Sequence, residues 1–336
     1  MEIHNRSKYV FLTGGSGFVG QYIIRELVAN GYRVKALSRS AESDKTITAA
    51  GGTPTRCSML DEAQLEQATE GCVMVIHCAA KLETNASSVQ DLYKDNITAT
   101  QLIYNASRTN KVESFVFIST EGVLMDGKDV IDATEDMPLP PLEQLGWYNE
   151  SKAKAENYIL EQCNQQQQHN MRAMIVRLPL VWGKGDNVLT QLTQMANRLS
   201  WFWIGSGNNK LSIVHVRNAA AGIVLAGQKG DNGDIFHLTD GEPVKLRPFF
   251  TQRFIKMGVA AWKLHMTLPV WLAWAMVWIM ALVWRVFRLK GLPILTKTGV
   301  IYCSKSFTIN DKKARTKLAY RNVITFAEGM DELRDK

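Results

Sequence analysis

The sequence predicts an α/β fold in which a doubly wound parallel sheet is joined to a smaller C-terminal lobe. Short apolar runs at 9–12, 73–76, 115–118 and 174–176 have the composition of strands that are buried on both faces, and helical stretches separate them. A glycine-rich loop directly follows the first run. The chain has 336 residues, which is enough for a well-buried core and one additional lobe.

The glycine-rich loop lies between a predicted strand and a predicted helix. Residues 22–28 place apolar side chains at helical spacing, and Asn30-Gly31 ends that helix. Gly14 and Gly17 permit a tight turn and a close approach to a pyrophosphate, while Gly20 lets helix and strand pack closely. An ordinary glycine-rich turn is the alternative. The flanking strand and helix favour a Rossmann-type nucleotide site.

A tyrosine and a lysine form the candidate catalytic pair. In Tyr148-Asn149-Glu150-Ser151-Lys152 the two residues are four apart, so on a helix they are neighbours. We expect the Lys152 ammonium to lower the pKa of the Tyr148 phenol from its usual value of about 10. Such a phenol can exchange a proton with a substrate oxygen while a hydride moves at the attached carbon. Taken alone, the pair is more often a surface coincidence, but its place downstream of the glycine loop favours an enzyme.

The TGxxGFxG loop and the YxxxK pair together resemble the extended short-chain dehydrogenase/reductases, over nearly the whole chain. In that family a strand end similar to Ser119-Thr120-Glu121-Gly122-Val123 carries the catalytic hydroxyl. The resemblance therefore implies a catalytic role for Thr120, with Ser119 as the second choice and a simple turn residue as the alternative. It also implies that Asn96 supports the active site. The implied cofactor contacts are Gly14, Gly15, Ser16, Gly17, Phe18, Val19, Ala79, Ala80, Tyr148, Lys152 and Pro179.

The cofactor preference depends on the end of the second predicted strand. An acidic residue there would bind the ribose 2′-hydroxyl of NAD, but the sequence has Ser38 and Arg39. These suit the 2′-phosphate of NADP, so NADP(H) is favoured over NAD(H), with a solvated Arg39 as the alternative. Ser58, followed by Met59 in the implied cofactor site, stands where the family pattern has an aspartate that contacts adenine. Asp61 is expected to cap the next helix.

Cysteines and histidines give no sign of a metal site. The five cysteines have no metal-ligand spacing and are interpreted as reduced thiols, and the six histidines form no cluster. His77 is expected to line the cofactor cleft or to pack in the core. Reduced thiols and the lack of a secretory signal favour a cytoplasmic location.

A tryptophan-rich stretch near the C-terminus is the second informative region. Residues 266–284 carry no charge, and Trp271, Trp274 and Trp278 recur at helical spacing. Residues 285–336 hold twelve basic and five acidic residues, a balance suited to an anionic membrane surface. Three alternatives are open: a buried lobe helix, a helix lying in the membrane interface, which we favour, and a true span. No nucleic-acid motif accompanies the basic residues.

The C-terminal segment narrows the resemblance to a branch of the family. The aromatic insertion ahead of residues 311–320 is similar to 3β-hydroxysteroid dehydrogenases and sterol-4α-carboxylate 3-dehydrogenases, and to bacterial 2-alkyl-3-oxoalkanoate reductases. This implies an NAD(P)-dependent oxidoreductase acting on the 3-oxo or 3-hydroxy group of a lipid-like substrate. A nucleotide-sugar epimerase or dehydratase and a non-catalytic nucleotide-binding scaffold are the alternatives, and a homodimer is left open. We expect residues 1–180 to form the nucleotide-binding core, and 181–336 mainly the substrate lobe, with some segments returning to the core and the tryptophan-rich segment at 266–290.

Overall fold

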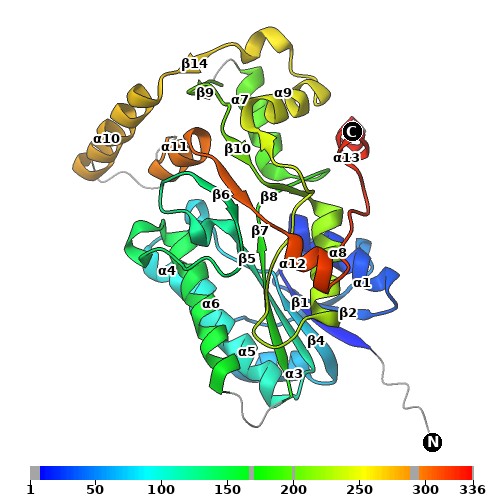
Figure 1. The fold of residues 1–336 in the computed structure, drawn as a ribbon. Coiled ribbons are helices and arrows are strands. Elements are labelled where there is room, and N and C mark those ends of the chain that lie inside the picture. Colours follow the sequence, from blue (N-terminus) through cyan, green and yellow to red (C-terminus); the bar gives the residue numbers. More distant parts are fainter. Residues whose placement is uncertain (1–7, 166–169, 199–200, 288–294, 335–336) are drawn as a thin grey trace, which may run out of the picture.

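A seven-stranded parallel sheet forms the centre of the molecule, which we describe from a computed structural model covering residues 8–165, 170–198, 201–287 and 295–334 (Figure 1). The strand order is β12-β7-β5-β4-β1-β2-β3, so the chain reverses its direction across the sheet between β1 and β4. The predicted doubly wound α/β fold is therefore confirmed. The strands are β1 (Tyr9–Thr13), β2 (Arg33–Ser38), β3 (Thr53–Arg56), β4 (Cys72–His77), β5 (Ser114–Thr120), β7 (Arg172–Leu178) and β12 (Ile235–His237).

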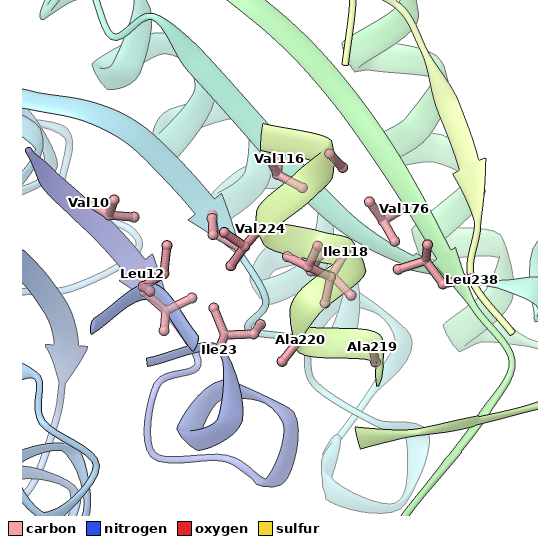
Figure 2. Packing of buried hydrophobic residues seen from close by; sticks show 14 of the residues in the cluster. Val10, Leu12, Ile23, Val116, Ile118, Val176, Ala219, Ala220, Val224 and Leu238 are labelled. Carbon is pink, nitrogen blue, oxygen red and sulfur yellow. The ribbon is translucent and has the colours of Figure 1, made fainter. Parts of the chain in front are cut away.

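Helices cover both faces of this sheet because its strands are apolar on both faces. Val116 and Ile118 of β5 pack toward α1 (Phe18–Ala29) and α8 (Val216–Lys229), and Figure 2 shows α8 lying across the strands on this face. The alternate residues, such as Phe117, pack on the other face. That face is covered by α3 (Glu62–Thr69), α5 (Ala99–Thr109) and α6 (Trp147–Gln165). The helix α2 (Ala41–Ala49) lies next to β2 and β3.

The smaller lobe is built around a four-stranded sheet in the order β13-β10-β15-β6. Its strand β6 precedes residue 180, whereas β12 and α8 of the core follow it, so the chain crosses between core and lobe several times. The remaining strands are β6 (Val130–Ala133), β8 (Leu180–Trp182), β9 (Trp203–Ile204), β10 (Lys210–Leu211), β11 (Ile213–His215), β13 (Val244–Lys245), β14 (Thr267–Leu268) and β15 (Phe307–Ile309). The remaining α-helices are α4 (Val89–Tyr93), α7 (Asn187–Asn197), α9 (Leu246–Lys256), α10 (Val270–Phe287), α11 (Lys297–Ser304), α12 (Lys312–Lys317) and α13 (Phe326–Glu332).

The helix α10 carries the tryptophan-rich segment and lies at the outer edge of the lobe (Figure 1). One side packs on α11, with Trp274, Met276, Val277 and Met280 against a small apolar cluster, and Ala273 is its one buried residue. Trp271 and Trp278 are 72% and 74% exposed, and the exposed side continues through Ile279, Leu282 and Val286. Phe287 is exposed at the end of the helix. A buried lobe helix is therefore wrong. By length and composition α10 is able to cross a membrane; residues 288–290 of the predicted segment lie outside the described part of the chain.

Part of the basic C-terminal region lies away from α10, on helices that pack against other elements. The helix α12 packs against α8 and β12, and α13 packs against α9. Lys313 pairs with Asp234 at 3.1 Å, and Lys317 pairs with Asp231 at 2.7 Å. These positive charges are therefore neutralised largely by carboxylates of the chain itself.

Candidate active site

The glycine loop fits a dinucleotide because it lacks side chains where the backbone is closest. Gly14 has a φ of 75°, and the Gly17 amide donates to its carbonyl oxygen at 3.0 Å. A Cβ on Gly20 would lie only 2.0 Å from the Gly14 oxygen, so helix and loop could not pack as they do. Gly17 caps α1 without a side-chain hydrogen bond, which leaves the first amides of this helix available to a phosphate.

A cavity of about 470 Å³ opens over this loop at the carboxyl edge of the sheet. Predicted cofactor residues that line it are Gly14, Ser16, Gly17, Phe18, Val19, Arg39, Met59, Ala79 and Ala80. Predicted residues that do not line it are Gly15, Ser38, Ser58, Pro179, Tyr148 and Lys152. Sequence reasoning missed its lining residues Cys78, Lys81, Leu82, Asn85 and Asp95, and named Gly20 only for helix packing. Most of these missed residues follow β4 in a segment without a recognisable motif.

Arg39 lines this cavity, whereas Ser58 does not. Arg39 is exposed on its lining and has no ion-pair partner among the described residues. Ser58 is exposed outside the cavity lining, and its hydroxyl accepts from the Leu60 amide of its own loop at 3.2 Å. Asp61 accepts from the Gln64 amide at 3.0 Å, which confirms its predicted role as a helix cap. A guanidinium without an ion-pair partner among the described residues thus lines the cavity, and Ser58 itself offers no carboxylate for an adenine contact.

The candidate catalytic pair, Tyr148 and Lys152, lies on the first turns of α6. The Tyr148 amide donates to Glu83 Oε1 at 2.9 Å, which fixes the start of the helix. Lys152 is 2% exposed, and its Nζ lies 3.9 Å from the centroid of the Phe117 ring. Burial lowers the pKa of Lys152 to about 8.

The expected lowering of the Tyr148 pKa is wrong for this structure. Burial is the main cause, and the nearby Cys78 adds to it when its thiol is ionised; together they raise the pKa of Tyr148 to about 12. The Lys152 ammonium lies against Phe117 and does not appear among the groups that shift Tyr148. Tyr148 therefore holds its proton at neutral pH, as a proton donor in carbonyl reduction must.

Asn96 ties the helix α6 to the cavity wall. It lies in a turn of π-helix at Lys94–Thr98, an irregularity that is frequent at functional sites. Its Nδ2 donates to Ser151 Oγ at 2.9 Å, and that hydroxyl donates to the Tyr148 carbonyl at 2.7 Å. Its Oδ1 accepts from the Lys81 amide at 2.7 Å. Asn96 thus connects the segment at Lys81, which lines the cavity, to the helix that carries Tyr148.

The two candidate hydroxyls at the end of β5 have different surroundings. Thr120 is half-buried, and its Oγ1 accepts from the Gly122 amide at 3.1 Å, so its proton is free for another acceptor. The Ser119 hydroxyl is buried and has no partner in the described part of the chain. Thr120 is thus the more accessible of the two.

Two other predicted features are structural. His77 is fully buried between Thr13 and Thr100, at 2.6 and 3.0 Å, and burial lowers its pKa to about 3. Arg177, two residues before the implied cofactor contact Pro179, pairs with Glu156 at 2.7 Å inside the core. Across the described residues, no group of three or more histidine, cysteine or acidic side chains is placed to hold a metal ion.

A family model described as "NAD dependent epimerase/dehydratase family" matches residues 10–238, the part of the chain that carries the loop and the pair. The chain belongs to this family. Over 329 residues it is 59% identical to a "Sterol-4-alpha-carboxylate 3-dehydrogenase, decarboxylating" of Dictyostelium discoideum, covering 97% of this chain and 100% of the relative. A "4-hydroxy-2-methyl-3-oxo-4-farnesyl-3,4-dihydroquinoline-1-oxide ketoreductase" of Stigmatella aurantiaca is 31% identical, over 96% and 95%. A "2-alkyl-3-oxoalkanoate reductase" of Shewanella oneidensis is 25% identical, over 97% and 85%.

Solved structures share the fold of this family member. A dTDP-glucose 4,6-dehydratase of Streptomyces venezuelae, solved with NAD bound, superposes with a TM-score of 0.74 at 19% identity, over 97% of this chain and 95% of that chain. The family and its dehydrogenase and reductase relatives confirm the predicted enzyme class: the protein is an NAD(P)-dependent oxidoreductase.

Proposed function

We propose that this oxidoreductase acts on the 3-hydroxy or 3-oxo group of a sterol-like lipid that carries a carboxylate on the neighbouring carbon. The observation that carries the proposal is the full-length 59% identity to a sterol-4-alpha-carboxylate 3-dehydrogenase, in a chain that keeps the Tyr148 and Lys152 pair. A long-chain 3-oxo acid is the second candidate substrate, because a 2-alkyl-3-oxoalkanoate reductase is also related over most of its length.

In this proposal Tyr148 and Thr120 handle the oxygen of the substrate. When bound, the nicotinamide takes or gives a hydride at the reacting carbon. Thr120 donates a hydrogen bond to the oxygen, and Tyr148 gives the oxygen a proton in reduction. In oxidation Tyr148 takes the hydroxyl proton after the phenol has lost its own. Lys152, one of the implied cofactor contacts, supplies a buried positive charge beside the bound cofactor. In the oxidative direction the 3-hydroxyl becomes a carbonyl, the neighbouring carboxylate is then a β-oxo acid, and it leaves as CO2 while its electron pair passes toward the carbonyl oxygen.

The cofactor in this proposal is NADP(H) rather than NAD(H). Arg39 supports it, because its exposed guanidinium lines the cavity and has no ion-pair partner among the described residues. The second strand ends without the carboxylate that would bind a free 2′-hydroxyl. Ser38, although buried, belongs to the same strand end and donates to the Ser40 carbonyl, which shapes that turn.

The helix α10 is proposed to lie in a membrane interface and to bring the protein to its lipid substrate. Its exposed residues fall on one side of the helix while the other side packs on α11, an arrangement that suits a helix lying in the interface better than a span. Tryptophan is favoured at that depth. The exposed Leu82 and Trp147 flank the start of the catalytic helix, so apolar surface is also present beside Tyr148. We place the core in the cytoplasm, in keeping with its free cysteines.

A spectroscopic assay of cofactor turnover tests the proposal. The purified protein is given NADP+ or NAD+ with a 3-hydroxysterol 4-carboxylate, a 3-hydroxysterol without the carboxylate, a 3-hydroxy fatty acid or a nucleotide sugar. We expect reduction of NADP+ with the sterol carboxylate to be the most efficient, with CO2 released in equal amount. Turnover of the nucleotide sugar alone would replace this function by that of a sugar epimerase or dehydratase.

A further inference from the structure

Glu121 is a buried acid directly after the candidate catalytic Thr120. It is 1% exposed, and its Oε1 accepts a hydrogen bond from the Tyr302 hydroxyl at 2.9 Å. Its Oε2 is buried and has no hydrogen-bond partner in the described part of the chain. A buried polar atom without a partner costs roughly 1–3 kcal/mol, so such an atom beside an active site is a candidate for binding a ligand.

The buried carboxyl group of Glu121 favours its protonated form. Burial raises its pKa well above the ordinary value, and the hydrogen bond from Tyr302 opposes this shift. No cation contributes to the shift, so the group is not half of an ion pair. Because Oε1 accepts from Tyr302, the acid proton belongs on Oε2, which then is a donor in need of an acceptor.

Three elements that border the catalytic site converge on Glu121. The first is the end of β5, and the second is the start of α6, where Asn149 lies so close to Gly122 that a Cβ there would be 2.3 Å from Asn149 Oδ1. The third is α11, which carries Tyr302 and begins against the residue before the catalytic helix, since a Cβ on Gly146 would lie 3.3 Å from Thr298 Oγ1. Glu121 thus follows Thr120 directly and is joined to α11 by the hydrogen bond from Tyr302.

We propose that the Glu121 carboxyl group is a specificity-determining residue that donates a hydrogen bond from Oε2 to the carboxylate beside the reacting carbon of the substrate, with Tyr302 fixing its orientation. This inference rests on the proposed function, which supplies the carboxylate. A protonated carboxyl and a carboxylate share one proton favourably, whereas two carboxylates repel each other. A neutral donor also holds the carboxylate without an opposing full charge, which would stabilise it against loss of CO2.

The test compares two substrates that differ only in the 4-carboxylate. The quantity measured is the ratio of kcat/KM for the 3-hydroxysterol 4-carboxylate to that for the same sterol without it. We expect Glu121→Met to lower this ratio at least tenfold, and Tyr302→Phe to lower it in the same direction by less. Glu121→Gln should keep the ratio within about threefold, because its amide retains an N–H donor and an oxygen for Tyr302. Glu113→Met is the matched control, because Glu113 is exposed directly before β5.

The outcomes separate the inference from the function on which it rests. Equal losses for both substrates in a folded Glu121→Met protein would make Glu121 a structural residue and overturn the inference alone. If that variant does not fold, an unchanged ratio in Tyr302→Phe together with a large loss of the ratio in Glu121→Gln overturns it instead. Failure of the wild type to oxidise either sterol overturns the inference and the proposed function together.

Discussion

The carboxyl edge of the large sheet and the helix α10 are both rich in apolar residues. The rest of the chain buries those of the sheet edge and leaves many of those on α10 exposed. At the sheet edge, strands and helices cover one another, and Phe117 is fully buried beneath Lys152. On α10, Trp271 and Trp278 remain mostly exposed although the helix has packed one side on α11. The chain thus supplies the partner for one apolar region and leaves the other without one.

The two regions differ in the source of the free energy that apolar burial contributes. Burying a large apolar side chain contributes about 1.5–3 kcal/mol, and the sheet edge gains this within the fold. The exposed side of α10 gains it only from something outside the chain. Changes at the sheet edge should therefore alter chemistry and cofactor binding, and changes on the exposed side of α10 should alter only where the protein is found.

The largest effect is expected at Gly20. In Gly20→Ala the new methyl would meet the Gly14 carbonyl oxygen at 2.0 Å, so the loop and α1 must separate. We expect cofactor binding, followed by fluorescence titration, to fall below detection. Gly31→Ala is the control: Gly31 has a φ of 79° but no atom within 4 Å of an added Cβ, so the variant should lose some stability and keep its cofactor.

The next effect is expected at Tyr148. Tyr148→Phe removes the exchangeable proton and keeps the ring, so kcat should fall about a hundredfold or more while cofactor affinity is retained. Tyr158→Phe is matched to it, since Tyr158 lies on the same helix and its hydroxyl donates to Asn105 at 3.0 Å. Steady-state kinetics measure kcat for both variants. An equal kcat for the two variants would contradict the assignment of Tyr148 as the group that exchanges the proton.

A smaller effect is expected at Arg39. If its guanidinium binds the 2′-phosphate, Arg39→Ala should weaken NADPH by roughly 1.5–3 kcal/mol and leave NADH nearly unchanged. Arg33→Ala, at the other end of the same strand, should change neither affinity. Equal losses for the two cofactors, or a wild type that prefers NADH, would remove the assignment.

The smallest effect on chemistry is expected on α10. Replacing Trp271 and Trp278 together by serine should release the protein from lipid vesicles in a sedimentation assay, with turnover of a short soluble substrate retained. Trp147→Ser, at an exposed tryptophan outside α10, should leave sedimentation unchanged. Because the C-terminal lysines pair with carboxylates of the chain, added salt should weaken binding only modestly. If the wild-type protein does not sediment with vesicles, the exposed side of α10 does not bind lipid, and the proposed membrane contact is wrong.

The sequence by itself determined the features that depend on short spacings. The strand, glycine loop and helix from residue 9 onward are local, and so is the spacing of Tyr148 and Lys152, because a helix places residues four apart on one side. The cap at Asp61 is local as well. The apolar runs of the strands likewise predicted a sheet buried on both faces.

Only the tertiary structure decided what depends on residues far apart in the chain. Tyr302 meets Glu121 across 181 positions, and no local pattern predicts that contact or the burial that protonates the acid. The expected lowering of the Tyr148 pKa by Lys152 was wrong for the same reason, because the Lys152 ammonium lies against Phe117 of β5. Trp274 and Trp278 look alike in sequence, but packing on α11 covers one of them and leaves the other exposed. Spacing fixes which side of a helix a residue is on, whereas its pKa and its exposure depend on which distant segment packs against that side.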